Sequence, residues 1–280
     1  MKKTVLFTAA LVAVSAVSAQ TGEITSNRGE NWLSQDGDWG LTFEATPLLN
    51  YAGNLFNNGN NTGVMSMNNL FSSAGAAGIK GNQVVIGAKK LIDANTAYRG
   101  RVRLGFGSEK ETAKVADLSA GAAADAKVDN VTKNGFMGID LGFGLEKRVG
   151  STRVVGVYGA MLNVGFGSSK TTYEYGNAIT ATNAGPRDTE VKNGSTMAIG
   201  LQAFGGVEWF CAPKISLSGE YTWGLALSST GFGSSTSEEW DAANSNIKTT
   251  TTEGTTNKKN AFSLDTGVSG ASIGVNFYFQ

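Results

Sequence analysis

The chain has 280 residues, with 23 basic and 23 acidic side chains and no histidine. This charge balance argues against a nucleic-acid partner, which would favour a basic face. Its single cysteine, Cys211, excludes an intrachain disulfide. Because histidine commonly supplies the general acid or base near neutral pH, we expect no enzyme activity and no catalytic, cofactor or metal site. The nearest acidic cluster, Glu238, Glu239 and Asp241, is interpreted as a solvated loop.

The first residues have the pattern of a secretory signal. Lys2 and Lys3 precede a short apolar stretch, and small residues end it at Ala19. That stretch is shorter than the roughly 20 apolar residues of a membrane-spanning helix. We therefore predict a signal peptide at residues 1–19, a short periplasmic segment at 20–38 and one β domain at 39–280.

From Met137 onward, apolar residues alternate with small or charged ones. One parity reads Met137, Ile139, Leu141, Phe143 and Leu145, and the other reads Gly138, Asp140, Gly142, Gly144 and Glu146. Because successive side chains of a strand point to opposite faces, one face of this strand is apolar. The pattern recurs along the chain. It predicts eight strands near 39–51, 83–92, 97–108, 135–148, 153–169, 196–210, 214–229 and 261–279.

Short and long connections alternate strictly between the predicted strands. The short ones lie near 93–96, 150–152 and 211–213, and the long ones near 53–82, 109–134, 171–195 and 230–260. Outer-membrane barrels place short turns in the periplasm and long loops outside. We therefore predict an all-β fold, a transmembrane antiparallel up-and-down β-barrel. Eight strands is the favoured count, and ten is the alternative if the loop at 230–260 contains a hairpin.

In this pattern the chain resembles the small outer-membrane β-barrel proteins of Gram-negative bacteria, of the eight-stranded OmpA-barrel and OmpX type. The most specific part is the last strand, which ends Phe277-Tyr278-Phe279 before an additional Gln280. The resemblance implies a location in the outer membrane, extracellular loops and periplasmic termini. It also implies contact with outer-membrane lipid and lipopolysaccharide, and insertion by the barrel-assembly machinery, which reads a terminal aromatic residue.

Charged residues occupy the non-apolar parity of several predicted strands. Arginine facing lipid at the bilayer midplane costs roughly 2–4 kcal/mol, so these side chains should face the lumen. The predicted lumen set is Arg99, Arg101, Arg103, Asp140, Glu146, Glu44, Glu208 and Glu220. We expect Arg101 and Arg103 to lie within salt-bridge distance of these carboxylates. An ion-pair network that fills the lumen is favoured, and a charged channel is the alternative.

Aromatic residues on the apolar parity predict belts at the bilayer interfaces. The predicted lipid-facing set is Trp39, Trp209, Tyr221, Trp223, Phe277 and Phe279. In the first long loop, the apolar residues Val64, Met65, Met67, Leu70 and Phe71 would either cap the barrel mouth or dock a partner. We expect a structural or surface-interaction role, with a protein partner in an outer-membrane complex as one form of it. A small porin-like channel is the alternative.

Overall fold

The computed structural model describes residues 24–45, 86–265 and 271–280. Within them the chain forms twelve β-strands and no helix: β1 (Trp39–Glu44), β2 (Ile86–Asp93), β3 (Thr96–Ala116), β4 (Lys127–Val149), β5 (Val154–Glu174), β6 (Arg187–Lys192), β7 (Thr196–Ala212), β8 (Ile215–Thr230), β9 (Ser234–Asp241), β10 (Asn246–Glu253), β11 (Lys259–Asp265) and β12 (Ala271–Phe279). The all-β, antiparallel, up-and-down prediction is confirmed. The predicted signal peptide and the apolar residues of the first long loop lie outside the described residues.

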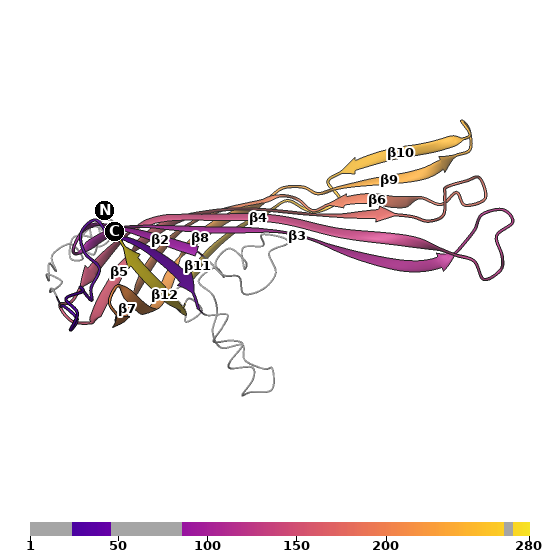
Figure 1. Ribbon diagram of the computed structural model, residues 1–280. Helices are drawn as coiled ribbons and strands as arrows, with labels where there is room; N and C mark the ends of the chain where they lie inside the picture. Colours follow the sequence, from indigo (N-terminus) through magenta and orange to yellow (C-terminus); the bar gives the residue numbers. More distant parts are fainter. Residues whose placement is uncertain (1–23, 46–85, 266–270) are drawn as a thin grey trace, which may run out of the picture.

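Antiparallel pairings run through eight strands and return to the first. In the order β1, β2, β3, β4, β5, β7, β8, β12, each strand pairs with the next. β12 then pairs with β1, from Trp39↔Phe279 to Glu44↔Gly274. The described parts nearest the two chain ends therefore lie together (Figure 1). This ring separates an inner face from an outer face.

Beyond the ring, the sheet continues as six strands in the order β10-β9-β6-β5-β4-β3. β3 and β4 stay in unbroken register from Thr96↔Lys147 to Ala116↔Lys127, and they carry this projecting sheet far from the ring (Figure 1). β6 joins the sheet at Lys170↔Lys192, and the β9–β10 hairpin adds its last two strands. The long connections predicted at 109–134, 171–195 and 230–260 are therefore shorter than expected, because much of each range is β-strand.

The strands of the projecting sheet lack the apolar alternation that identified the others. β10 reads Asn-Ile-Lys-Thr-Thr-Thr-Thr-Glu and is exposed along its whole length. Threonine favours strands because its branched side chain suits a pleated surface, even where neither face is buried. The hairpin that was the alternative for 230–260 exists as β9–β10, but it lengthens the projecting sheet and does not widen the ring. The predicted strand at 261–279 is two strands, β11 and β12.

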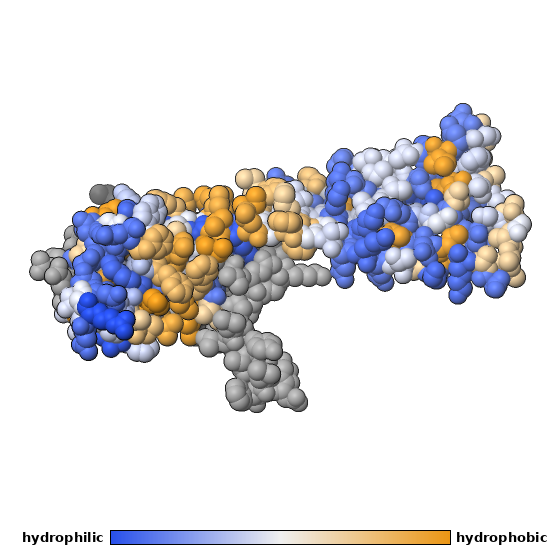
Figure 2. Space-filling view, in the orientation of Figure 1, coloured by the Kyte–Doolittle hydropathy of each residue, from blue (hydrophilic) through white to orange (hydrophobic). Residues whose placement is uncertain are grey.

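The ring reverses the usual distribution of apolar and charged side chains. Each ring strand exposes large apolar side chains on its outer face, among them Leu104, Phe143 and Met197, which are 61–65% exposed. These side chains form one band between the polar end near the termini and the polar projecting sheet (Figure 2). The inner face instead buries charged side chains such as Lys89 and Glu208.

Residues 24–38 fold against the end of the ring that carries the short connections and the end of β12. Leu33 is buried in a cluster with Val155, Phe210 and other inward-facing apolar side chains. The guanidinium of Arg153 lies 3.9 Å from the ring centroid of Trp32, close enough for a cation–π interaction. This N-terminal segment therefore closes one end of the interior with apolar contacts.

Glycines allow inward-facing side chains to approach the backbone closely. At Gly159 an added Cβ would lie 2.0 Å from the Leu145 carbonyl oxygen and 2.7 Å from the Phe204 ring. We predict that Gly159→Ala lowers the free energy of unfolding by about 1–3 kcal/mol through overpacking, measured by urea unfolding with tryptophan fluorescence. Gly219→Ala is the matched control, because nothing lies within 4 Å of a Cβ there. An equal loss in both variants would contradict the prediction.

Candidate functional site

Six of the buried charged side chains on the inner face of the ring lie together and are here called the ion cluster. Its members are Lys89, Arg99, Glu146, Arg148, Glu208 and Glu220, each at most 6% exposed. They come from β2, β3, β4, β7 and β8, whose inward parity directs them toward one another. Three cations meet three carboxylates, so the cluster is balanced. Buried charges are tolerated when they are paired in this way.

Two carboxylates of β4 and β7 make most of the contacts in the ion cluster. Glu146 lies 3.0 Å from Lys89 Nζ and 2.7 Å from Arg148 Nη1. It also lies 3.3 Å from Arg99 Nη1. Glu208 lies 2.9 Å from Arg148 Nη1 and 3.6 Å from Lys89 Nζ. The cluster therefore joins β2, β3, β4 and β7 across the interior.

Neutral side chains of β12, β8 and β7 also contact the ion cluster. The Tyr278 hydroxyl on β12 donates to Glu208 Oε1 at 2.6 Å, and the Ser216 hydroxyl on β8 donates to the same oxygen. Arg99 lies with its guanidinium 4.4 Å from the ring centroid of Phe204. Through Tyr278, the strand that closes the ring is tied to the charges inside it.

The structure divides the predicted lumen residues into three groups. Arg99, Glu146, Glu208 and Glu220 belong to the ion cluster, where Arg99 and Glu220 lie 2.6 Å apart. Arg103 lies 3.5 Å from Asp140 as a separate pair. Arg101 and Glu44 line a cavity of about 30 Å³ beside the cluster. Such a cavity has room for about two water molecules, so side chains fill this level of the interior.

Sequence reasoning missed Lys89, Arg148 and Tyr278. Lys89 is followed by Lys90, which hides the alternation, although Lys90 turns outward and lies 4.8 Å from the Trp39 ring centroid. Arg148 shares its parity with Glu146, and that parity is the signal that would have found it. Tyr278 stands inside an aromatic run, which conceals its inward direction.

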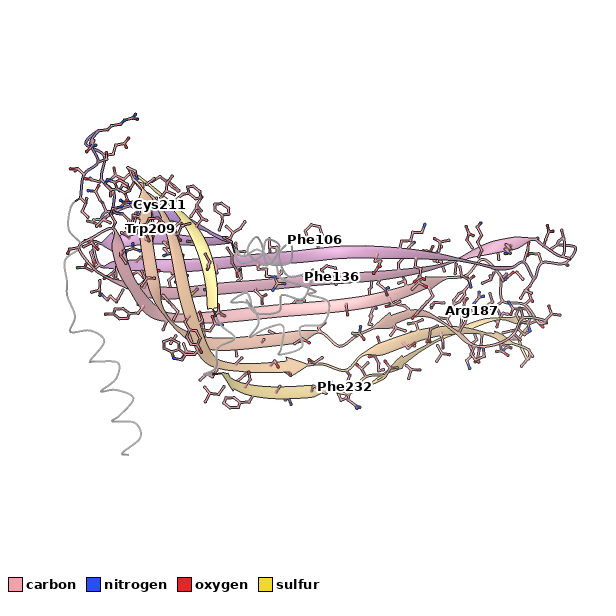
Figure 3. All side chains as sticks on the ribbon, turned by 90° about the horizontal axis from the view of Figure 1, so that it is seen from below. Phe106, Phe136, Arg187, Trp209, Cys211 and Phe232 are labelled. Atoms are coloured by element: carbon pink, nitrogen blue, oxygen red, sulfur yellow. The ribbon has the colours of Figure 1, made fainter. Side chains whose placement is uncertain are left out.

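The predicted lipid-facing aromatic residues lie on the outer face of the ring. Trp39, Trp209, Trp223, Phe277 and Phe279 are each 39–48% exposed, and Tyr221 packs beside Trp223 with ring centroids 5.8 Å apart. Trp209 lies near the end of the ring that carries the short turns (Figure 3). Next to it, Cys211 occupies a register shift at the end of β7 and not the turn itself.

Polar contacts join the strands of the projecting sheet. Arg187 on β6 lies 2.7 Å from Glu238 Oε1 on β9, and its guanidinium lies 4.3 Å from the Tyr175 ring centroid. The Tyr175 hydroxyl donates to the Asp188 carbonyl at 2.7 Å. Burial raises the pKa of Tyr175, so this donor keeps its proton near neutral pH. Glu238 is therefore an ion-paired strand residue, and the interpretation of a solvated acidic loop is wrong for it.

Glu146 offers a direct test of the ion cluster. We predict that Glu146→Gln lowers the free energy of unfolding by about 3–5 kcal/mol, because removing one member of a buried ion pair leaves its partners uncompensated. Urea unfolding measures the loss. Asp129→Asn is the control, because its pair with Lys114 is exposed and exposed pairs contribute little. If the two variants unfold at the same urea concentration, the cluster does not stabilise the ring.

In the described ranges, no three His, Cys, Asp or Glu side chains form a group that could hold a metal ion. No helix of the described chain is long and apolar enough to cross a membrane. Comparisons with protein-family models, with curated proteins and with solved structures find no match.

Proposed function

We propose that this chain is a non-enzymatic outer-membrane β-barrel protein of a Gram-negative bacterium, with a structural or surface-interaction role. The observation that carries the proposal is the reversed ring, which is apolar outside and charged inside. Monomeric soluble proteins rarely expose contiguous apolar patches larger than a few hundred Å². Here apolar side chains cover the outer faces of all the ring strands, and hydrocarbon is the surrounding that suits such a surface.

The height of the apolar band supports this setting. On β4 the outward apolar residues run from Met137 to Leu145, a span of nine residues. A tilted strand needs roughly 9–11 residues to cross the hydrocarbon core. Lysines bound the run on the same face, Lys133 on one side and Lys147 on the other.

The two ends of the ring support an orientation. The short connections at 94–95, 150–153 and 213–214 lie at the end that carries the termini, and the long strands project from the other end (Figure 1). Outer-membrane barrels place short turns in the periplasm and long segments outside. We therefore orient the termini toward the periplasm and the projecting sheet toward the exterior.

The filled interior favours a scaffold over a channel. The ion cluster crosses the lumen, the cavity beside it holds about 30 Å³, and the Leu33 cluster closes the end near the termini. The surface role then falls to the projecting sheet, whose last strand, β10, is exposed throughout. An exposed sheet edge offers unpaired backbone groups to a strand of a protein partner.

Leu141 tests the membrane setting, since it lies at the centre of the apolar run. We expect the wild-type protein in the outer-membrane fraction. Leu141→Arg should lower the folded amount there, because an arginine that faces lipid at the midplane destabilises a barrel by about 2–4 kcal/mol. Gel mobility with and without heating measures the folded fraction. Thr172→Arg, on an outward position of the projecting sheet, is the control and should insert normally. Wild-type protein that stays in the soluble fraction would refute the proposal.

Bilayer recordings separate the scaffold from the porin-like alternative. Because paired side chains fill the lumen, we expect reconstituted wild-type protein to give no steady single-channel steps. A purified general porin serves as the positive control under the same conditions. Reproducible stepwise conductance would replace the scaffold proposal with a channel.

A further inference from the structure

Just beyond the apolar band, four neighbouring positions around the sheet repeat one outward-facing order of apolar residue, small residue and lysine. The order is Phe106, Ser108 and Lys110 on β3; Met137, Gly135 and Lys133 on β4; Phe166, Ser168 and Lys170 on β5; and Met197, Ser195 and Lys192 where β7 meets β6. Lys110, Lys133, Lys170 and Lys192 are called the lysine row. The repeat places each of these lysines four or five residues beyond the last apolar residue of its strand.

The pairing registers put the lysine row on the same face as the apolar band. The registers of β3 with β4 and of β4 with β5 run without a shift through this region, so parity is preserved. Lys110 lies opposite Lys133, and Lys170 lies opposite Lys192. Like charges directly opposite one another destabilise a sheet. A bound anion would reduce the repulsion between the lysines of these two neighbouring pairs.

A cavity of about 450 Å³ is lined by residues from both faces of the sheet near the lysine row. Met137, Lys170 and Lys192 line it from the outer face, and Phe136 and Ser169 line it from the inner face. The small residues Gly135 and Ser168 also line it. This cavity therefore places apolar and cationic groups within reach of one amphiphilic molecule.

The lysine row keeps a net positive charge after its ion pairs are counted. Lys133 pairs with Glu174, while Glu190 lies 3.6 Å from Lys170 and 2.8 Å from Lys192. The four lysines form ion pairs with two carboxylates, and a third carboxylate, Glu253, attracts Lys192. Four positive charges therefore meet three negative ones, and Glu174 and Glu190 lie farther from the apolar band than the lysines do. The hydrogen bond to Glu190 raises the pKa of Lys192, so this lysine remains charged near neutral pH.

We propose that the lysine row binds the phosphate groups of a phosphorylated lipid in the outer leaflet, with the lipid chains against the apolar band below. The proposal rests on the proposed membrane setting. Lys110, Lys133 and Lys170 each lie four residues beyond the last apolar residue, and Lys192 lies five beyond it. These separations correspond to about 13–17 Å along a strand and about 9–12 Å in height for a strand tilted by about 45°. A flexible lysine stem can reach back into the headgroup layer, which is about 5–8 Å deep.

The test compares two charge-matched variants of the full chain in neutral detergent micelles. In one, Lys110, Lys133, Lys170 and Lys192 are all changed to Gln. In the other, four lysines farther along the projecting strands and loops are changed to Gln: Lys114, Lys127, Lys248 and Lys258. Bound bisphosphorylated lipid A is counted by native mass spectrometry during a titration, with phosphatidylcholine as the zwitterionic probe and inorganic phosphate as competitor.

We expect the row variant to bind lipid A at least about tenfold more weakly than wild type, since each lysine near an anionic surface contributes about 1 kcal/mol. The control variant should bind like wild type, and phosphatidylcholine should not distinguish the proteins. Equal affinity of all three proteins for lipid A overturns the proposal. Displacement of lipid A by an equal concentration of inorganic phosphate also overturns it, because the row would then be a free-anion site. Both variants keep the apolar band, so failure to enter micelles would instead count against the membrane setting.

Discussion

The pairing of β1 with β12 is the constraint on which the rest of this structure depends. A sheet that returns to its first strand has no free edge along the closed part, and every side chain must then point either inward or outward. Eight strands enclose only enough space for side chains to fill. Because side chains alternate along each strand, the polar ones collect on the inner face of the ring and the apolar ones on its outer face.

The enclosed space explains why the charges inside are arranged as a cluster. Glu146 and Glu208 take their cationic partners from three strands, β2, β3 and β4, and Tyr278 adds a hydrogen bond from the strand that closes the ring. Glycines such as Gly159 have no side chain, which leaves room for the Phe204 ring and for the Arg99 guanidinium that lies over it. The projecting sheet has no such enclosure, and its contacts are those of a polar surface, such as Arg187 with Glu238.

The sequence predicted the ring strands better than the projecting sheet, for a physical reason. Alternation reveals a strand only when its two faces meet different surroundings, as at 137–145, whereas both faces of β10 meet the same one. The alternation along β4 correctly predicted that Glu146 points inward. The identity of the side chains in the cluster, such as Lys89 and Tyr278, depends instead on which strands face one another across the interior. That information lies in the three-dimensional closure and not in local spacing. The lysine row is equally invisible along the chain, because its members align only through registers.

The closing strands come from opposite ends of the chain, and this sets the order in which the ring can assemble. Thr42 and Asn276, 234 positions apart in the sequence, form a hydrogen bond, whereas β2 and β3 are joined by the two residues 94–95. The entropy lost on closing a loop grows with its length, and contacts between distant residues form slowly. The hairpins therefore form first, as local units with their inner charges still uncovered. The enclosure of these charges is completed only when β12, carrying Tyr278, pairs with β1, and we expect this pairing to be the slowest step of folding.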